Sequence, residues 1–236
     1  MKDLPPLARA PILILGMLSL LSGVMTGLAR LAWEVPNVAM DATGMHGALM
    51  ITAFFGTVIS LERAVAIGQR WAYLAPAAAG TSGIVILACW PPVVAMALAI
   101  FAAAIMLVAS IQVLRRLTAP FTVVLAIGSG CWLIGSLVWL AADWIAPAVP
   151  WWLSFLVITI AGERLELSRF LPTPPLARQV FYAIVSSILF GNLLSLWQPG
   201  SGLVIFSAGL LALALWLLRF DIAWRNARLS GLPPLV

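Results

Sequence analysis

The feature that most constrains this chain is a series of long apolar runs separated by short polar segments. An α-helix needs about 20 apolar residues to cross roughly 30 Å of hydrocarbon. Eight runs approach or exceed that length, and each is bounded by charge, proline, glycine or tryptophan. They are Pro11–Ala32, Gly44–Ile67, Tyr73–Trp90, Val93–Leu114, Pro120–Ala142, Trp151–Leu167, Val180–Trp197 and Gly202–Leu218. The pattern predicts an all-α, polytopic transmembrane bundle of about eight helices, in which residues 1–236 form a single integral membrane domain.

The composition requires lipid as the solvent. Apolar residues make up 63% of the chain and charged residues only 9%, whereas soluble domains carry about 25% charged residues. The formal charge of +5 has no soluble basic face to carry it, so we expect no nucleic-acid partner. The expected partners are the lipid bilayer and either other membrane subunits or further copies of this chain.

Two local features affect the helix count. The first run is too long for the apolar core of a signal peptide, so we expect a spanning helix that also serves as the targeting signal. Trp90-Pro91-Pro92 has the sequence of a tight turn and divides the third run from the fourth. Without that turn, the two runs would fuse into one very long helix.

Basic residues separate to one side of the predicted bundle. If the N-terminus is cytoplasmic, only Arg30 of the 13 basic residues lies outside. The residues on the inner side are Lys2, Arg9, Arg63, Arg70, Arg115, Arg116, Arg164, Arg169, Arg178, Arg219, Arg225 and Arg228. The positive-inside rule then predicts both termini in the cytoplasm, as in a multi-pass protein of a cytoplasmic (inner) membrane. The outer boundary holds the acids Glu34, Asp41 and Asp143 and a belt of Trp33, Trp90, Trp144, Trp151, Trp152 and Trp197.

Two sequence patterns concern helix packing. Gly23 and Gly27 form a GxxxG on the first helix, which lets a neighbouring helix approach closely in lipid. The segments around Glu62 and Glu163 resemble each other, and each lies second in a block of four helices. They suggest parallel repeats over residues 11–117 and 118–228, with coincidence in a low-complexity sequence as the alternative.

Five charged residues lie near the inner ends of the second and sixth helices: Glu62, Arg63, Glu163, Arg164 and Glu166. Ionisable groups in a membrane are costly and therefore often functional. Pairing of Glu62 with Arg164, and of Glu163 with Arg63, would offset that cost. One interpretation is a polar site or proton path. The other is an inter-helix clasp, or side chains that reach out to the interface.

A group of soft ligands lies at the opposite end. His46 is the only histidine, and Met50 follows it by four residues, so the two share a helix face. Met45 is adjacent, and Met25 is expected near the outer end of the first helix. Imidazole and thioether suit Cu(I), and either can hold haem iron axially. The sequence predicts a haem b or copper site here, with core packing and an interfacial histidine as the alternative.

Other chemistry is disfavoured. Nucleotide-binding, zinc-protease and serine-hydrolase motifs are absent, and the longest loops leave no room for a soluble catalytic domain. Cys89 and Cys131 fall within apolar runs and are expected to be buried. With one histidine, bis-histidine haem ligation within one chain is excluded. No residue is assigned a catalytic role.

The second helix resembles one family. His46, Gly47 and the run Met50 to Gly56 are similar to the histidine-initiated, glycine-containing helix of the NnrS family. That resemblance implies a polytopic bacterial membrane protein associated with haem, copper and the response to nitric oxide. NnrS proteins are longer and contain more histidines than this chain.

Three functional hypotheses remain open at this stage. The first is a redox-associated haem or copper protein that uses the His46 group. The second is a small-solute or proton-coupled transporter or channel that uses the glutamates. The third is a structural or assembly subunit of a membrane complex.

Overall fold

The computed structural model describes residues 3–37, 40, 42–167 and 174–220, and every regular element within these ranges is helical. This confirms the all-α fold. Seven helical segments are long and apolar enough to span a membrane: Pro6–Arg30, Ala48–Ile67, Pro92–Arg116, Pro120–Ala142, Ala146–Leu167, Pro175–Ser195 and Pro199–Phe220. The chain is therefore an integral multi-pass membrane protein whose helices contact lipid. Lys2, Asp41, Arg169, Arg225 and Arg228 lie outside the described residues.

The chain divides into two compact units, Met1–Leu156 and Val157–Val236. Unit 1 contains, in chain order, α1 (Pro6–Arg30), η1 (Thr43–Met45), η2 (Ala48–Phe55), α3 (Gly56–Ile67), η3 (Arg70–Tyr73), α4 (Leu74–Leu87), α5 (Pro92–Arg116), α6 (Pro120–Ala142), η4 (Ala146–Ala148) and the first part of α7 (Val149–Leu167). Unit 2 contains the rest of α7, α8 (Pro175–Ser195) and α9 (Pro199–Phe220). The boundary lies inside α7, and the proposed sequence repeat stays a prediction.

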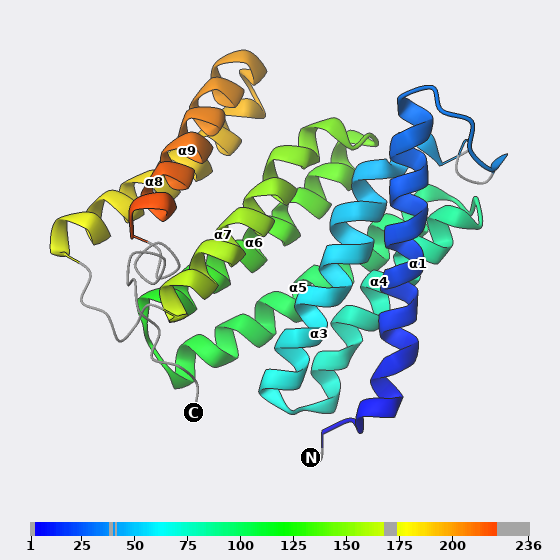
Figure 1. The fold of residues 1–236 in the computed structure, drawn as a ribbon, viewed down its shortest axis with the longest axis horizontal. Coiled ribbons are helices and arrows are strands. Elements are labelled where there is room, and N and C mark those ends of the chain that lie inside the picture. The colour runs from blue at the N-terminus through cyan, green and yellow to red at the C-terminus, as the bar shows by residue number, and fades with distance from the viewer. Residues whose placement is uncertain (1–2, 38–39, 41, 168–173, 221–236) are drawn as a thin grey trace, which may run out of the picture. The chain divides into compact units, whose positions relative to one another are not determined.

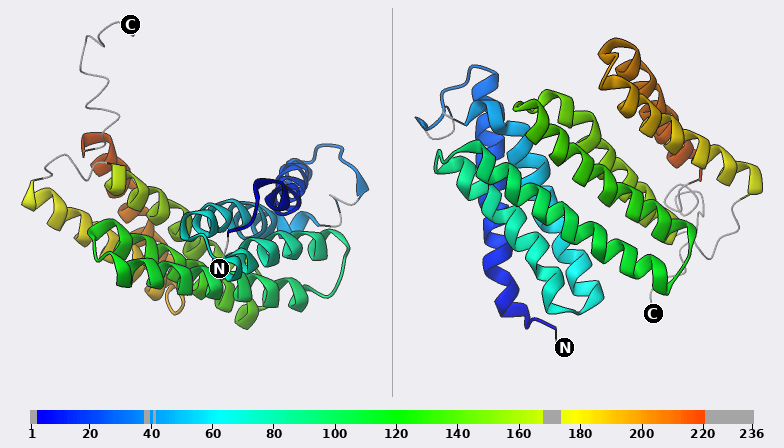
Figure 2. Two further views of the ribbon diagram at one scale, coloured as in Figure 1. Left: turned by 90° about the horizontal axis from the view of Figure 1, so that it is seen from below. Right: turned by 180° about the vertical axis from the view of Figure 1, so that it is seen from behind.

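The eighth predicted helix is α4, which is only 14 residues long. With the four-residue 3₁₀ turn η3 before it, the helical segment measures about 29 Å, close to the hydrocarbon thickness. It contacts α1, η2, α3 and α5 within unit 1 (Figures 1 and 2). Small residues on α4 permit its close contact with α1. A methyl group on Gly80 would lie 2.7 Å from the Leu15 Cβ, and one on Gly83 would overlap Ser19. A helix enclosed by neighbours does not need a full lipid-facing length.

The turn after α4 confirms the predicted division between the third and fourth helices. Cys89 has a positive φ of 54°, and Pro91, with a ψ of 126°, is not helical, so α5 begins at Pro92. Proline suits the first helical position, since its missing N–H would be unpaired there in any case. Cys89 is exposed in this turn, so the expectation that it is buried was wrong, whereas Cys131 is buried as predicted.

A tryptophan core fills the α6–α7 side of unit 1. Trp139 and Trp152 meet edge to face, with ring centroids 5.4 Å apart, and Trp132 stacks on Phe155 at 5.0 Å. Gly56 makes room for Trp132, since a methyl group there would lie 2.5 Å from its Cζ2 atom. Trp151 and Trp152 were predicted in the interfacial belt, which was wrong, because they are 5% and 0% exposed. The predicted belt residues Trp33, Trp90, Trp144 and Trp197 are exposed.

Unit 2 is dominated by the α8–α9 pair, which lie side by side (Figures 1 and 2). A methyl group on Gly191 would lie 2.5 Å from the backbone nitrogen of Phe206. At the other end of the pair, the Trp216 indole donates a hydrogen bond of 2.9 Å to the Ala177 carbonyl. Close backbone approach is what binds helices together where lipid removes the hydrophobic drive.

Apart from Arg30, which lies in the last turn of α1 at the opposite end, the described arginines gather at one end of each unit. In unit 1, α1 begins beside the α3–α4 turn, since Arg9 lies over the Tyr73 ring, and Trp71 shares a groove with Arg115. In unit 2, Arg178 opens α8 and Arg219 closes the antiparallel α9. We call the arginine-rich end the inner end and the opposite end the outer end. Which one faces the cytoplasm stays a prediction.

A polar cluster ties the start of α1 to η3 at the inner end. The Tyr73 hydroxyl donates to Asp3 Oδ1 at 2.7 Å, and Arg9 Nη2 lies 2.6 Å from Asp3 Oδ2. The Tyr73 hydrogen bond, aided by Arg9, holds the pKa of Asp3 below its usual value. Burial and the same hydrogen bond raise the pKa of Tyr73. Together they hold Asp3 and the first turns of α1 against η3, between α3 and α4.

We expect Gly191→Ala to destabilise the α8–α9 pair by about 1–3 kcal/mol, the usual cost of overpacking, because backbone atoms cannot move aside as a side chain can. Thermal unfolding in detergent measures the loss. Gly200→Ala on α9 is the matched control, since nothing lies within 4 Å of its added methyl group. Equal midpoints for the two variants would contradict this account of the packing.

We also expect the stabilising effect of the Tyr73 hydroxyl to depend on pH. The pKa of Asp3 is lowered by folding, so its contribution is present at neutral pH and is lost as the pH falls below about 4. Tyr73→Phe should therefore lower the thermal midpoint near pH 7 and have little effect at pH 3. A difference between the two proteins that persists unchanged in acid would refute the assignment.

Candidate functional site

The second membrane span is built from three kinds of helix. A 3₁₀ turn at Thr43–Met45 leads through His46 and Gly47 into an eight-residue π-helix, η2, and only then into α3. Thr52 donates a hydrogen bond of 2.7 Å to the Ala48 carbonyl within η2. π-Helical segments are rare and frequently lie at functional sites. The apolar run Gly44–Ile67 predicted one continuous helix, because hydropathy carries no signal for this change of winding.

His46 lies against α1 at the outer end of unit 1. Its Nδ1 is 2.7 Å from the carbonyl oxygen of Gly23, and a methyl group on Gly27 would lie 2.9 Å from its Cε1 atom. A carbonyl only accepts hydrogen bonds, so Nδ1 carries the proton and donates it. In neutral imidazole this leaves the lone pair on Nε2. A backbone carbonyl that fixes the tautomer in this way is typical of histidines that bind metal through the other nitrogen.

Met50 packs against Gly23, the other glycine of the predicted GxxxG motif on α1. A methyl group on Gly23 would lie 2.6 Å from the Met50 sulfur, so the thioether rests directly on the α1 backbone. Gly23 and Gly27 are one turn apart, about 6 Å along the helix axis. The structure thus brings His46 and Met50 to adjacent places on one face of α1. The glycine pair accommodates these two side chains.

The other two methionines of the predicted site, Met25 and Met45, do not pack on this face of α1. Met25 is two residues from both Gly23 and Gly27, which places it on the opposite face of α1, and it is 40% exposed. The structure therefore does not bring Met25 to His46. Met45 lines a separate cavity of about 230 Å³ together with Cys89 and Trp139.

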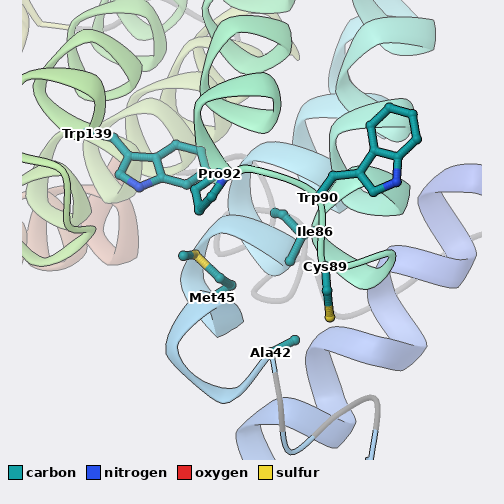
Figure 3. A pocket seen from close by; sticks show the side chains of 7 residues that line it. All are labelled: Ala42, Met45, Ile86, Cys89, Trp90, Pro92 and Trp139. Atoms are coloured by element: carbon teal, nitrogen blue, oxygen red, sulfur yellow. The ribbon is translucent and has the colours of Figure 1, made fainter.

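The cavity lies at the outer end, where η1 meets the α4–α5 turn. Figure 3 shows the Met45 thioether and the Cys89 thiol reaching it from different elements, with the Trp139 ring beside Pro92. Cys89 was missed as a possible soft ligand because its apolar surroundings in the sequence indicated burial. The proline pair that follows it was the available signal that it lies in a turn.

The predicted polar cluster divides between the two units. Glu62 and Arg63 belong to unit 1, whereas Glu163, Arg164 and Glu166 belong to unit 2. Glu62 is exposed and Arg63 half-buried, with its buried Nε making no hydrogen bond to the described residues. Glu163 and Arg164 each take part in an interaction. The proposed pairs would join different units and stay predictions.

No charged side chain in the described ranges is buried. The same part of the chain contains no group of three or more His, Cys, Asp or Glu residues placed to hold a metal ion. A metal site built on His46 and Met50 would combine imidazole with thioether sulfur. The indole N–H groups of Trp139 and Trp152 are also buried without an acceptor among the described residues.

We expect Gly27→Ala to destabilise the protein by about 1–3 kcal/mol, because the added methyl group displaces the His46 ring. Thermal unfolding of Gly27→Ala, His46→Ala and the double variant tests this contact. The double variant should lose less stability than the sum of the two single changes. Gly44→Ala is the control, since its methyl group meets nothing within 4 Å. Strict additivity of the two single changes would argue against direct contact.

Comparison with known proteins places the chain in a family without assigning it an activity. No curated protein and no solved structure matched the chain. A family model described as a domain of unknown function, DUF8744, matches residues 9–236. The match covers nearly the whole chain, from the first turn of α1 onward, so this integral membrane protein belongs to the DUF8744 family.

Proposed function

We propose that this protein binds a soft metal ion, Cu(I), at the outer end of unit 1, with the Nε2 atom of His46 as the central ligand. The observation that carries the proposal is the 2.7 Å hydrogen bond from His46 Nδ1 to the Gly23 carbonyl. It directs the free lone pair to Nε2 and holds the ring in one orientation. A fixed imidazole costs less entropy to order when a metal binds.

Sulfur supplies the remaining donors. Met50 lies one turn along α1 from His46, and its unbranched side chain can adjust its rotamer toward an ion at Nε2. Met45 directly precedes His46 in the chain and lines the neighbouring cavity. Thioether and imidazole together select Cu(I) over harder cations. A Cu(I) ion needs no charged ligand, which agrees with the absence of buried charge among the described residues.

Copper suits this geometry better than haem. The His46 ring packs on Gly27, so the α1 backbone occupies space that a porphyrin would need on that side. The adjacent cavity of about 230 Å³ is below the roughly 300–1,000 Å³ of pockets for drug-sized ligands. When bound, Cu(I) would supply one-electron redox chemistry or serve as cargo, and the protein residues would hold it and limit access of water.

The π-helix supports a specialised role for this segment. The wider winding of η2 begins two residues after His46, and such segments are retained mainly where function needs them. A transporter that uses Glu62, Glu163 or Glu166, and a purely structural subunit, are the alternatives. The exposed position of Glu62 gives the transporter hypothesis less support than the His46 geometry gives the copper hypothesis.

We expect the protein, purified in mild detergent and loaded with Cu(I) under reducing conditions, to retain the metal stoichiometrically. His46→Ala should abolish retention, and Met50→Leu should weaken it by about 10–100-fold, a typical loss on perturbing a metal site. Competition with a chromophoric Cu(I) chelator measures the affinities. Met25→Leu is the matched control and should bind as the wild type does, because Met25 lies on the far face of α1.

The outcomes separate the hypotheses. Retention of Cu(I) by His46→Ala would refute the assignment, as would a wild-type protein that releases all its copper to the chelator. A Soret band in the absorption spectrum that disappears in His46→Ala would indicate haem in place of copper. Flux in proteoliposomes that depends on Glu163 but not on His46 would favour the transporter.

A further inference from the structure

The carbonyl oxygen of Gly23 accepts more than the hydrogen bond from His46. The Nδ1 atom of His46 lies 2.7 Å from this oxygen, and the Thr26 hydroxyl donates to the same oxygen at 2.8 Å. Because α1 is helical through this turn, the Gly27 N–H also points at it. Three donors therefore converge on one carbonyl oxygen, which has only two lone pairs.

The Thr26 hydroxyl has no water to turn to. The buried residues of α1 are Gly16, Ser19, Gly23 and Thr26, and their spacing of three, four and three residues forms one stripe on the helix. Thr26 is 0% exposed within that stripe. A buried hydroxyl needs a hydrogen-bond partner inside the protein, and here that partner is the Gly23 carbonyl. The sharing of this acceptor is therefore built into the packing of α1.

Sharing the acceptor affects the imidazole. Donors that use one carbonyl oxygen weaken each other, because each draws electron density from the same lone pairs. A strong hydrogen bond from one ring nitrogen to a carbonyl makes the other nitrogen a better metal ligand. The Thr26 hydroxyl thus reduces the electron density that the Gly23 carbonyl passes through the His46 ring to Nε2.

Hydroxyls that donate to carbonyls of their own helix are common in this protein. Ser19 donates to the Leu15 carbonyl at 2.9 Å, and Thr52 donates to the Ala48 carbonyl at 2.7 Å. Such bonds satisfy a hydroxyl where water is absent. Thr26 differs from Ser19 in one respect, which is that its acceptor is the carbonyl that also holds the proposed metal ligand.

We propose that Thr26 is a positioning residue of the His46 site. Through the Gly23 carbonyl it limits the strength of the Nδ1 hydrogen bond, and it thereby lowers the affinity of Nε2 for Cu(I). The effect on affinity rests on the copper function proposed above. The effect on the hydrogen bond does not, since all its donors and its acceptor belong to this chain.

Nuclear magnetic resonance of the copper-free protein in detergent tests the hydrogen bond. His46 is the only histidine, so labelling histidine with ¹⁵N reports on one imidazole. Thr26→Val keeps the branched shape and removes the hydroxyl, and the Nδ1–H proton resonance should move to higher frequency as its bond to Gly23 strengthens. Thr26→Ser should restore the wild-type position. Ser19→Ala is the matched control and should change nothing, because its Leu15 acceptor lies about 12 Å from Gly23 along the axis.

Competition with a chromophoric Cu(I) chelator tests the affinity. Thr26→Val should bind Cu(I) about 3–10-fold more tightly, a smaller change than the 10–100-fold typical of removing such a partner altogether. Thr26→Ser and Ser19→Ala should bind as the wild type does. Damage to the fold lowers affinity, so a gain in Thr26→Val cannot come from misfolding.

The outcomes are distinct. An Nδ1–H resonance that stays in place in Thr26→Val would overturn the inference, as would a Thr26→Val protein that binds Cu(I) more weakly than the wild type. A wild type that binds no Cu(I), with the resonance of Thr26→Val shifted as expected, would refute the copper function and uphold the action of Thr26 on His46.

Discussion

Contact between helix backbones through small residues is the constraint on which unit 1 depends. Lipid is as apolar as the side chains, so helices gain little by burying leucine against leucine and must gain from close packing and hydrogen bonds. Gly80 and Gly83 let α4 approach α1, while the hydroxyls of Thr57 and Ser60 bond to carbonyls on their own helix. Because polar groups are satisfied locally, the interior of unit 1 can contain serine and threonine without charged residues.

Close contact through glycine also forms the outer site, where the second span packs on α1. Gly23 and Gly27 leave space on α1 that the second span fills with His46 and Met50. The bond from His46 to the Gly23 carbonyl depends on this approach, since a larger residue at either glycine would move the imidazole away. Packing and ligand geometry are therefore one arrangement at this place. The outer end is rich in sulfur and aromatic rings, whereas the inner end is rich in guanidinium groups, so the two ends of unit 1 suit different classes of ligand.

The sequence was sufficient for the features set by hydropathy and helix-breaking residues. All eight predicted helices exist within the described residues, and the break at Pro91 was placed correctly because proline acts through local geometry. Helical spacing placed His46 and Met50 on one face, but that this face packs on Gly23 and Gly27 was seen only in the structure. Met25 was grouped with them because depth in the membrane can be estimated from the sequence, whereas the face of a helix cannot when all its faces are apolar. Trp151 and Trp152 were assigned to the belt for the same reason.

The winding of η2 has a consequence for how the second span works as a unit. A π-helix places more residues in each turn than an α-helix does, so the eight residues Ala48–Phe55 rotate everything before them relative to everything after them. The half that carries His46 and the half that carries Glu62 therefore face different directions from those that an uninterrupted α-helix would give them. Loss of a single residue from this segment would restore regular winding and turn the imidazole away from α1, although no ligand itself would have changed.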